Sequence, residues 1–138
     1  MYASECAQWR HVRGVWVRGK VRLRVAASRI HGKGLYAASD MEDGTRLGRL
    51  WGVRVWGPGT YDACVSHGRG AMRDSLVLLY IARDMWHVVD VRESVFFWMN
   101  CARHHPTVRV TPGGYVELIG DVAAGDELMW HYGDAFVC

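Results

Sequence analysis

The segment Gly125-Asp126-Glu127-Leu128-Met129-Trp130-His131-Tyr132-Gly133 carries more information about the fold than any other part of this chain. Glycine followed by aspartate predicts a tight turn. The residues after it alternate and end in aromatic side chains, which predicts a short strand. Two upstream segments accompany it, residues 28–37 (Ser-Arg-Ile-His-Gly-Lys-Gly-Leu-Tyr-Ala) and residues 98–103 (Trp-Met-Asn-Cys-Ala-Arg).

Length and composition indicate one compact domain. The chain has 138 residues, half of them hydrophobic, and 7 tryptophans, which is enough to build a core. With 16 glycines and only 3 prolines, many turns are expected. No apolar run approaches the roughly 20 residues that span a bilayer, so no membrane contact is expected. The N-terminus has no secretory signal, which favours the cytosol or nucleus.

The cysteines and histidines predict no metal site. Cys6, Cys64, Cys101 and Cys138 are far apart and form no C-x-x-C pair. A zinc site or a disulfide framework is therefore not implied, and four free thiols are the simpler interpretation. The adjacent His104 and His105 precede a proline, and such histidines in loops are usually solvated.

The positive charge is concentrated near the N-terminus. The net charge is +3, and Glu5 is the only acidic residue among the first 24. The basic residues of this arm are Arg10, Arg13, Arg18, Lys20, Arg22 and Arg24. Basic arms attract nucleic acids. A solvated strand face is the simpler interpretation, and the two are compatible.

The periodicity predicts a mostly β protein with short strands and frequent turns. In residues 12–25, Val15, Val17, Val21, Leu23 and Val25 share one parity, which predicts a hairpin or a bent strand pair with one buried and one basic face. One strand is expected over 47–56, and a loop over 60–73, with a short helix as the alternative. A buried hairpin is expected over 76–82 and 86–91. A helix over 75–85 is the alternative there. A single helical turn is expected within 93–102. Strands are expected at 108–110 and 115–119, and a last one after the turn at 121–126.

The three quoted segments, in this order, resemble the signature of SET-domain protein lysine methyltransferases over residues 22–135. The resemblance implies a mostly β SET-domain fold, with several small sheets around a C-terminal pseudoknot. It divides the chain into a basic N-terminal β segment, residues 1–21, and a SET domain, residues 22–138. The segment Asn-Cys-Ala-Arg at 100–103 looks like the PR subclass of these domains.

The resemblance also implies a cofactor site for S-adenosylmethionine. Glycines let the backbone adopt positive φ and approach a ligand closely, as the Gly32-Lys33-Gly34 turn would. The cofactor-binding residues are Lys33, Gly34, Leu35, Asn100, Cys101 and Tyr132. The central motif of the family is commonly R-F-I-N-H-S-C. Phe97 stands here at its arginine and Cys101 at its histidine.

Tyr132 takes the place of the family's catalytic tyrosine. Trp130, Phe136 and Tyr80 are the expected walls of the substrate channel. Trp130 stands where Phe or Tyr usually sets the number of methyl groups, so its bulk predicts low methylation states. The cysteine-rich zinc cluster that often follows is absent from residues 134–138. Phe136, a partner or a second copy of the chain would then close the channel.

The function implied is an S-adenosylmethionine-dependent protein lysine N-methyltransferase, with a histone tail as substrate. A chromatin regulator of this kind would work in the nucleus, with the cytoplasm as an alternative. The second hypothesis is a SET/PR-like module that has lost catalysis and binds protein or nucleic acid. The third is a small basic nucleic-acid-binding β domain, whose DNA binding would depend steeply on salt.

Overall fold

A computed structural model describes residues 9–50, 53–56, 76–82, 85–90, 94–102, 104–111 and 114–131. For the strands within residues 53–90, the structure describes the backbone alone. The elements are β1 (Arg10–Val12), β2 (Val15–Arg18), β3 (Val21–Ala27), β4 (Lys33–Ala37), β5 (Arg46–Arg49), β6 (Val53–Trp56), β7 (Leu76–Ala82), β8 (Met85–Asp90), the 3-10 turn η1 (Val95–Trp98), β9 (Asn100–Cys101), β10 (Val108–Val110), β11 (Tyr115–Leu118) and β12 (Glu127–Trp130). The described part contains no α-helix, so the mostly β prediction is confirmed.

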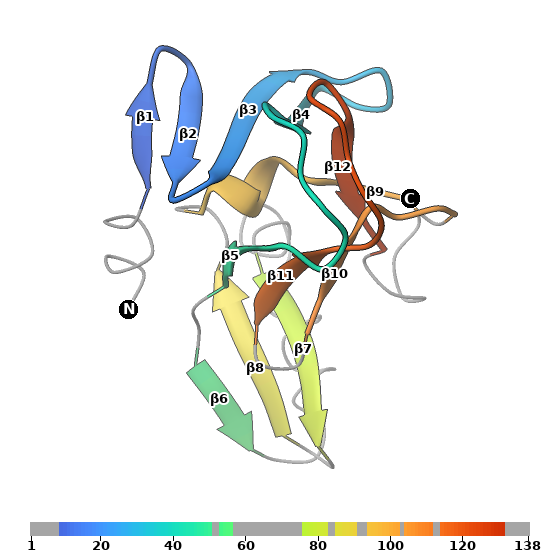
Figure 1. The fold of residues 1–138 in the computed structure, drawn as a ribbon. Coiled ribbons are helices and arrows are strands. Elements are labelled where there is room, and N and C mark those ends of the chain that lie inside the picture. Colours follow the sequence, from blue (N-terminus) through green and yellow to red (C-terminus); the bar gives the residue numbers. More distant parts are fainter. Residues whose placement is uncertain are drawn as a thin grey trace.

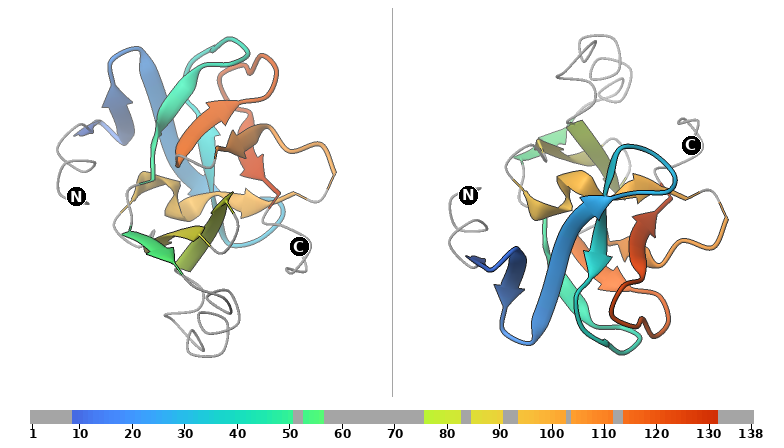
Figure 2. Two further views of the ribbon diagram at one scale, coloured as in Figure 1. Left: turned by 90° about the horizontal axis from the view of Figure 1, so that it is seen from below. Right: turned by 90° about the horizontal axis from the view of Figure 1, so that it is seen from above.

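The strands form two sheets (Figure 1). The larger has the order β1-β2-β3-β4-β12-β10-β11-β5, with β9 also paired to β12. The smaller has the order β6-β8-β7. Figure 2 shows the turn η1 between the β3–β4 part of the larger sheet and the smaller sheet. Strand β12 is therefore central to the larger sheet, because it pairs with β4, β10 and β9.

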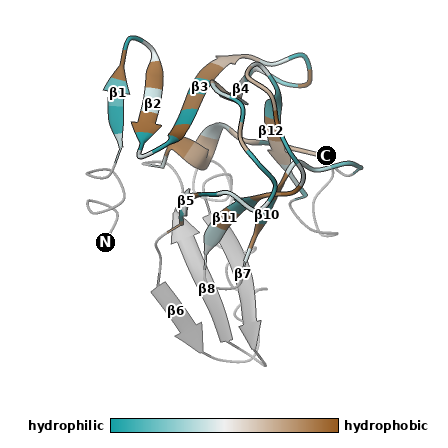
Figure 3. Ribbon diagram, viewed as in Figure 1, coloured by the Kyte–Doolittle hydropathy of each residue, from teal (hydrophilic) through white to brown (hydrophobic). Residues whose placement is uncertain are grey.

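The core lies under the larger sheet and consists of the inward side chains of successive strands. Leu23 of β3, Leu35 of β4 and Leu128 of β12 are fully buried across three neighbouring strands. Burying each leucine stabilises the fold by about 1.5–3 kcal/mol. Figure 3 shows the corresponding alternation of hydrophobic and hydrophilic residues along β3. This core fixes which face of β12 is available for a site.

The N-terminal hairpin forms as predicted, but its faces differ from the prediction. Arg18 pairs with Val21 across the Gly19-Lys20 turn, and Trp16 pairs with Leu23. Directly opposed residues of an antiparallel pair share a face. Trp16 and Arg18 therefore lie on the side of the buried Leu23, whereas Val17 lies opposite Arg22. The prediction that Val15 and Val17 share the buried face is wrong, because the two-residue turn changes the parity between the strands.

The single strand predicted over 47–56 is wrong. β5 ends at Arg49 and pairs with β11, while β6 starts at Val53 and pairs with β8 in the smaller sheet. Between them Leu50 is buried and its N–H donates to the carbonyl oxygen of Gly114 at 2.7 Å. This long-range contact continues the association of the β5 segment with the β11 segment, so the chain enters the smaller sheet only after Leu50.

Other predicted elements are confirmed. β7 and β8 form the predicted antiparallel hairpin, so the alternative helix is excluded over Leu76–Ala82. The predicted helical turn is η1, where the Ser94 hydroxyl caps by accepting from the Phe96 N–H. β10, β11 and β12 also form. The loop predicted over 60–73 lies outside the described residues, and the division at residue 21 stays a prediction.

Within the described part of the chain, no helix is long and apolar enough to cross a membrane. No group of three or more potential ligands there could hold a metal ion.

Candidate functional site

The three sequence segments converge on β12. Its first half pairs with β4, as Glu127 opposite Tyr36 and Leu128 opposite Leu35. Its second half runs parallel to β9, as Met129 opposite Asn100 and Trp130 opposite Cys101. Segments that are up to 99 residues apart in sequence thus meet at one strand. The course of the C-terminal segment that would complete a pseudoknot lies outside the described residues.

The carboxylate of Glu127 is the centre of a polar network between these segments. The Ser28 hydroxyl donates to it, with both oxygens at 2.9 Å. The Asn100 side-chain amide donates to Oε2 at 3.0 Å, and the Tyr36 hydroxyl lies 3.3 Å from Oε1. Hydrogen bonds to an ionised acceptor are roughly twice as strong as neutral ones. One carboxylate therefore holds the β3–β4 connection, β4 and β9 in a fixed arrangement.

Asn100 fixes the shape of the turn before β4. Its amide nitrogen lies 3.1 Å from the carbonyl oxygens of both His31 and Lys33, in addition to Glu127. The turn is also closed by the Ser28 N–H, which donates to the Gly32 carbonyl oxygen at 2.8 Å. The residues at the tip of this turn are exposed, so its main chain, held by these hydrogen bonds, is accessible to a ligand.

Gly34 is the residue at which the network and the backbone come closest. A Cβ atom there would lie 2.5 Å from Oε2 and 2.9 Å from Cδ of Glu127. It would also lie 3.1 Å from the Cβ atom of Ser28. Real Cβ atoms do not approach other atoms this closely, and the Glu127 side chain is held by its hydrogen bonds. Position 34 therefore requires glycine.

Tyr36 belongs to the same network through its hydroxyl group. That hydroxyl donates to the Ala27 carbonyl oxygen at 2.7 Å. Desolvation and the neighbouring negative charge of Glu127 raise the pKa of Tyr36 above its usual value. The tyrosine therefore stays a neutral donor beside the carboxylate at physiological pH.

An exposed aromatic pair borders the turn. Phe97 and Trp98 pack edge to face, with ring centroids 5.0 Å apart, and 36% and 37% of their surfaces are exposed. The Lys33 ammonium lies over the Trp98 ring, 5.5 Å from its centroid. Large aromatic rings usually bury their faces, so this pair offers a stacking surface next to the rigid turn.

Five of the predicted cofactor residues lie together here, with different roles. Lys33 and Asn100 present polar groups at the turn, whereas the Leu35 side chain is fully buried and offers only its backbone. Cys101 is in a disulfide, so the prediction of four free thiols is wrong at this residue. Cys6, Cys64 and Cys138 lie outside the described residues.

Of the predicted catalytic and channel residues, the structure describes only Trp130 with its side chain. Tyr132 and Phe136 lie outside the described residues, and for Tyr80 only the backbone of β7 is described. Trp130 is half-buried and packs against the core. These assignments stay predictions.

Sequence reasoning missed Glu127, Ser28, Tyr36 and Trp98 as site residues. Glu127 had a usable signal. It precedes the buried Leu128 in a strand, so alternation places its carboxylate on the opposite side. No local pattern indicates its contacts with Ser28 and Tyr36, because these residues lie 99 and 91 positions away.

The architecture is that of the SET-domain fold. The structure is similar to the crystal structure of CpSET8 from Cryptosporidium, with a TM-score of 0.63 and 14% sequence identity. The match covers 83% of this chain and 58% of the other, so this chain spans little more than half of that structure. No family model and no curated protein sequence matches the chain. The similarity therefore establishes the fold.

Proposed function

We propose that this protein is an S-adenosylmethionine-dependent protein lysine N-methyltransferase. The observation that carries the proposal is the Glu127–Asn100 network, which joins the glycine turn, β9 and β12 into one rigid unit in a SET-domain fold. The structural neighbour CpSET8 is a SET-domain methyltransferase and supports this class of activity.

The residues around the turn fit such a cofactor. Its adenine ring would find a stacking partner in the exposed Trp98 ring, beside the Lys33 side chain. The main chain of the turn, held by Asn100, would offer hydrogen-bonding groups that need no rearrangement on binding. The Glu127 carboxylate would add a favourable electrostatic field for a cofactor that carries positive charge.

The cofactor supplies a methyl group on a sulfonium, and the protein residues supply position and environment. A free lysine has a pKa of about 10.4, so the site must favour the neutral amine. A narrow apolar channel does this by desolvation. Trp130, Phe136 and Tyr80 are the proposed walls. The Tyr132 hydroxyl would hold the amine in line by a hydrogen bond, and such alignment lowers the barrier by several kcal/mol.

The proposed substrate is a histone tail, which would place the protein in the nucleus. Trp130 is proposed to restrict the channel to low methylation states. A trimethylated product from the wild-type protein, seen by mass spectrometry, would contradict that restriction.

The test is transfer of labelled methyl from S-adenosylmethionine to mixed core histones. Wild-type protein is compared with Tyr132→Phe and with the control Tyr115→Phe, which removes a hydroxyl in β11, outside this network. We expect label on a histone from the wild type and the control, and its loss with Tyr132→Phe. No label on histones or on a cell lysate would contradict the proposal.

The second candidate is a SET/PR-like binding module without catalysis. Phe97 and Cys101 favour it, because they replace the arginine and histidine of the family motif, and Cys101 is in a disulfide. Calorimetric titration with S-adenosylmethionine separates the two, since an enzyme must bind its cofactor and a scaffold need not.

A further inference from the structure

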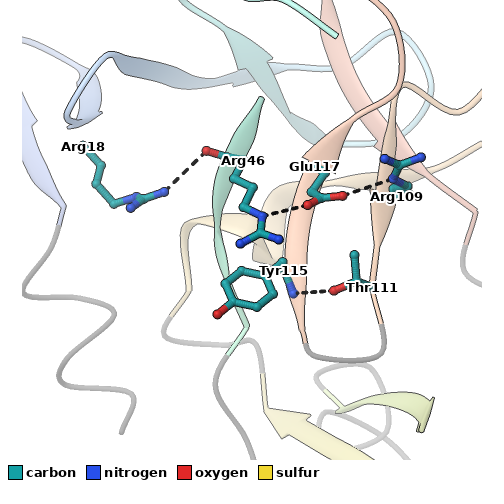
Figure 4. A network of polar contacts seen from close by, with 6 residues as sticks. All are labelled: Arg18, Arg46, Arg109, Thr111, Tyr115 and Glu117. Carbon is teal, nitrogen blue, oxygen red and sulfur yellow. Dashed lines mark hydrogen bonds and ion pairs between the residues drawn. The ribbon is translucent and has the colours of Figure 1, made fainter. Parts of the chain in front are cut away.

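A second polar surface lies on the outer face of β10, β11 and β5, away from the Glu127 network. We call it the arginine face and define it as Arg18, Arg46, Arg49, Arg109, Tyr115 and Glu117. Figure 4 shows all of these residues except Arg49. Arg109 and Arg46 stand opposite Glu117 from the two neighbouring strands. Arg49 stands opposite Tyr115 in the next row. Four arginines against one glutamate give this face a formal charge of +3, equal to that of the whole chain.

A β-bulge creates this concentration of charge. Gly48 pairs with Val116, but Arg46 pairs with Glu117, so Leu47 has no partner opposite and is fully buried. In a regular strand Arg46 and Arg49 would point to opposite faces. The extra residue brings both to the outer face, as bulges re-aim side chains. Both guanidinium groups lie over the Tyr115 ring, at 4.2 and 4.8 Å from its centroid.

The arginine side chains of this face are held by hydrogen bonds and keep further N–H groups that can donate to a ligand. Nε of Arg46 donates to Glu117 at 2.8 Å and Nε of Arg109 at 3.2 Å, while both side chains stay 60% exposed. Arg18 donates through Nε to the Leu47 carbonyl oxygen at 3.3 Å. A guanidinium group has five N–H donors, so the Nε contacts of Arg46 and Arg109 leave the terminal nitrogens of these two side chains available. Arg18 also donates through a terminal nitrogen to the Arg46 carbonyl oxygen at 3.5 Å. Side chains that are already ordered lose less entropy on binding.

We propose that the arginine face binds the phosphate backbone of double-stranded DNA. Guanidinium forks match phosphate geometry in bidentate contacts. Neighbouring strands are about 4.8 Å apart, so the charges are spread across three strands rather than along one line. That spread suits a broad polyanion better than a single extended acidic peptide. A protein partner would also need an apolar anchor, and the Tyr115 ring is covered by guanidinium groups.

This site differs from the basic N-terminal arm as the DNA-contacting element. Register places Arg10 opposite Val17, and Val17 opposite Arg22, on the face of the hairpin away from Arg18. The basic residues of the arm are therefore divided between two faces. Arg18 alone of the arm joins the arginine face.

The test measures binding to a labelled duplex of about 20 base pairs by fluorescence anisotropy, at about 50 to 200 mM salt. The main variant is Arg46→Gln/Arg109→Gln/Glu117→Gln, which removes both arginines without leaving Glu117 unpaired. Its net charge is one unit below that of the wild type. Arg10→Gln has the same net charge and is the matched control. Glu117→Gln alone raises the net charge by one unit. Circular dichroism and melting confirm that each variant is folded, and no cofactor is added, so the result is independent of the proposed enzymatic activity.

We expect the triple variant to bind more weakly and to reduce the slope of log K against log salt by about 1.8. Arg10→Gln should stay close to the wild type, and Glu117→Gln should bind more tightly. Two unrelated duplex sequences should bind equally, because phosphate contacts carry no sequence information. An equal loss with Arg10→Gln, or no binding by the wild type, would overturn the proposal. So would displacement of the duplex by a polyglutamate peptide at equal charge concentration, which would indicate an acidic protein partner instead.

Discussion

The side-chain amide of Asn100 lies 3.0 Å from a carboxylate oxygen of Glu127, and this contact joins β9 to β12 within a SET-domain fold. The same amide reaches the carbonyl oxygens on both sides of Gly32. One side chain thus ties the glycine turn to the central strand. Substitutions in this pair should affect both the stability of the fold and the geometry of the proposed cofactor site.

Replacing Glu127 by glutamine should destabilise the protein although the side chain keeps its size. The Ser28 hydroxyl and the Asn100 amide donate to this position, and the Tyr36 hydroxyl lies 3.3 Å from it. An amide has one acceptor oxygen, and its NH2 group would face donors. Hydrogen bonds to a charged group contribute about 1.5–3 kcal/mol, so we expect a loss of that order in urea unfolding. The control is Glu42→Gln, which neutralises an exposed carboxylate and should leave the midpoint nearly unchanged.

Replacing Asn100 by aspartate should be more harmful than replacing it by alanine. Alanine removes the donor that Asn100 gives to two carbonyl oxygens and to the Glu127 carboxylate, which keeps only its contacts with Ser28 and Tyr36, at a cost of about 1–3 kcal/mol. Aspartate adds a second negative charge beside the first, and like charges repel. Thermal melting at neutral pH should rank wild type above alanine and alanine above aspartate. The gap between the two variants should narrow in acid, where one carboxyl becomes protonated. A constant gap would contradict the electrostatic explanation.

Gly34→Ala should destabilise the protein through a collision with Glu127, and a double-mutant cycle can show this. The added Cβ would lie 2.5 Å from Oε2. In the Glu127→Ala background that oxygen is absent, so the same substitution should cost much less. Contacting residues commonly show coupling of about 0.5–3 kcal/mol. Equal costs in both backgrounds would show that strain at Gly34 arises elsewhere, for example at the Cβ atom of Ser28.

Local patterns in the sequence were sufficient to predict most strands. Alternation and glycine turns identified the strands around Leu23, Val108 and Leu128, and the apolar runs identified the β7–β8 hairpin. The break at Leu50 could not be predicted, because the Leu50 N–H donates to the carbonyl oxygen of Gly114, which lies 64 residues further along, and nothing local indicates this contact. The faces of the N-terminal hairpin were assigned wrongly because the two-residue turn at Gly19-Lys20 was not recognised. Such a turn changes which residues of the two strands share a face.

The site was predictable only as far as its motifs extend. The glycine turn and Asn100 lie within quoted segments, and the structure brings them together. Ser28 and Tyr36 stood in the same segments, but nothing local indicated that their hydroxyl groups face a carboxylate in β12. The disulfide of Cys101 has no local signal either, since cysteine pairing is set by the folded chain.

The ion pairs that Glu117 forms with Arg46 and Arg109 on the arginine face should make the stability of the protein depend on pH. Hydrogen bonds and charge from Arg46, followed by those from Arg109, lower the pKa of this carboxyl group below its usual value. A lowered pKa in the folded state means that the unfolded chain binds the proton more readily. The stabilisation is therefore present above the unfolded pKa of about 4.3 and is lost as the pH falls through the lower folded value. Both arginines are largely exposed, so we expect a contribution of at most about 1 kcal/mol. Chemical unfolding of wild type and Glu117→Gln at several pH values checks this. The stability difference should be largest at neutral pH and shrink in acid, and a difference that grows in acid would contradict the assigned sign.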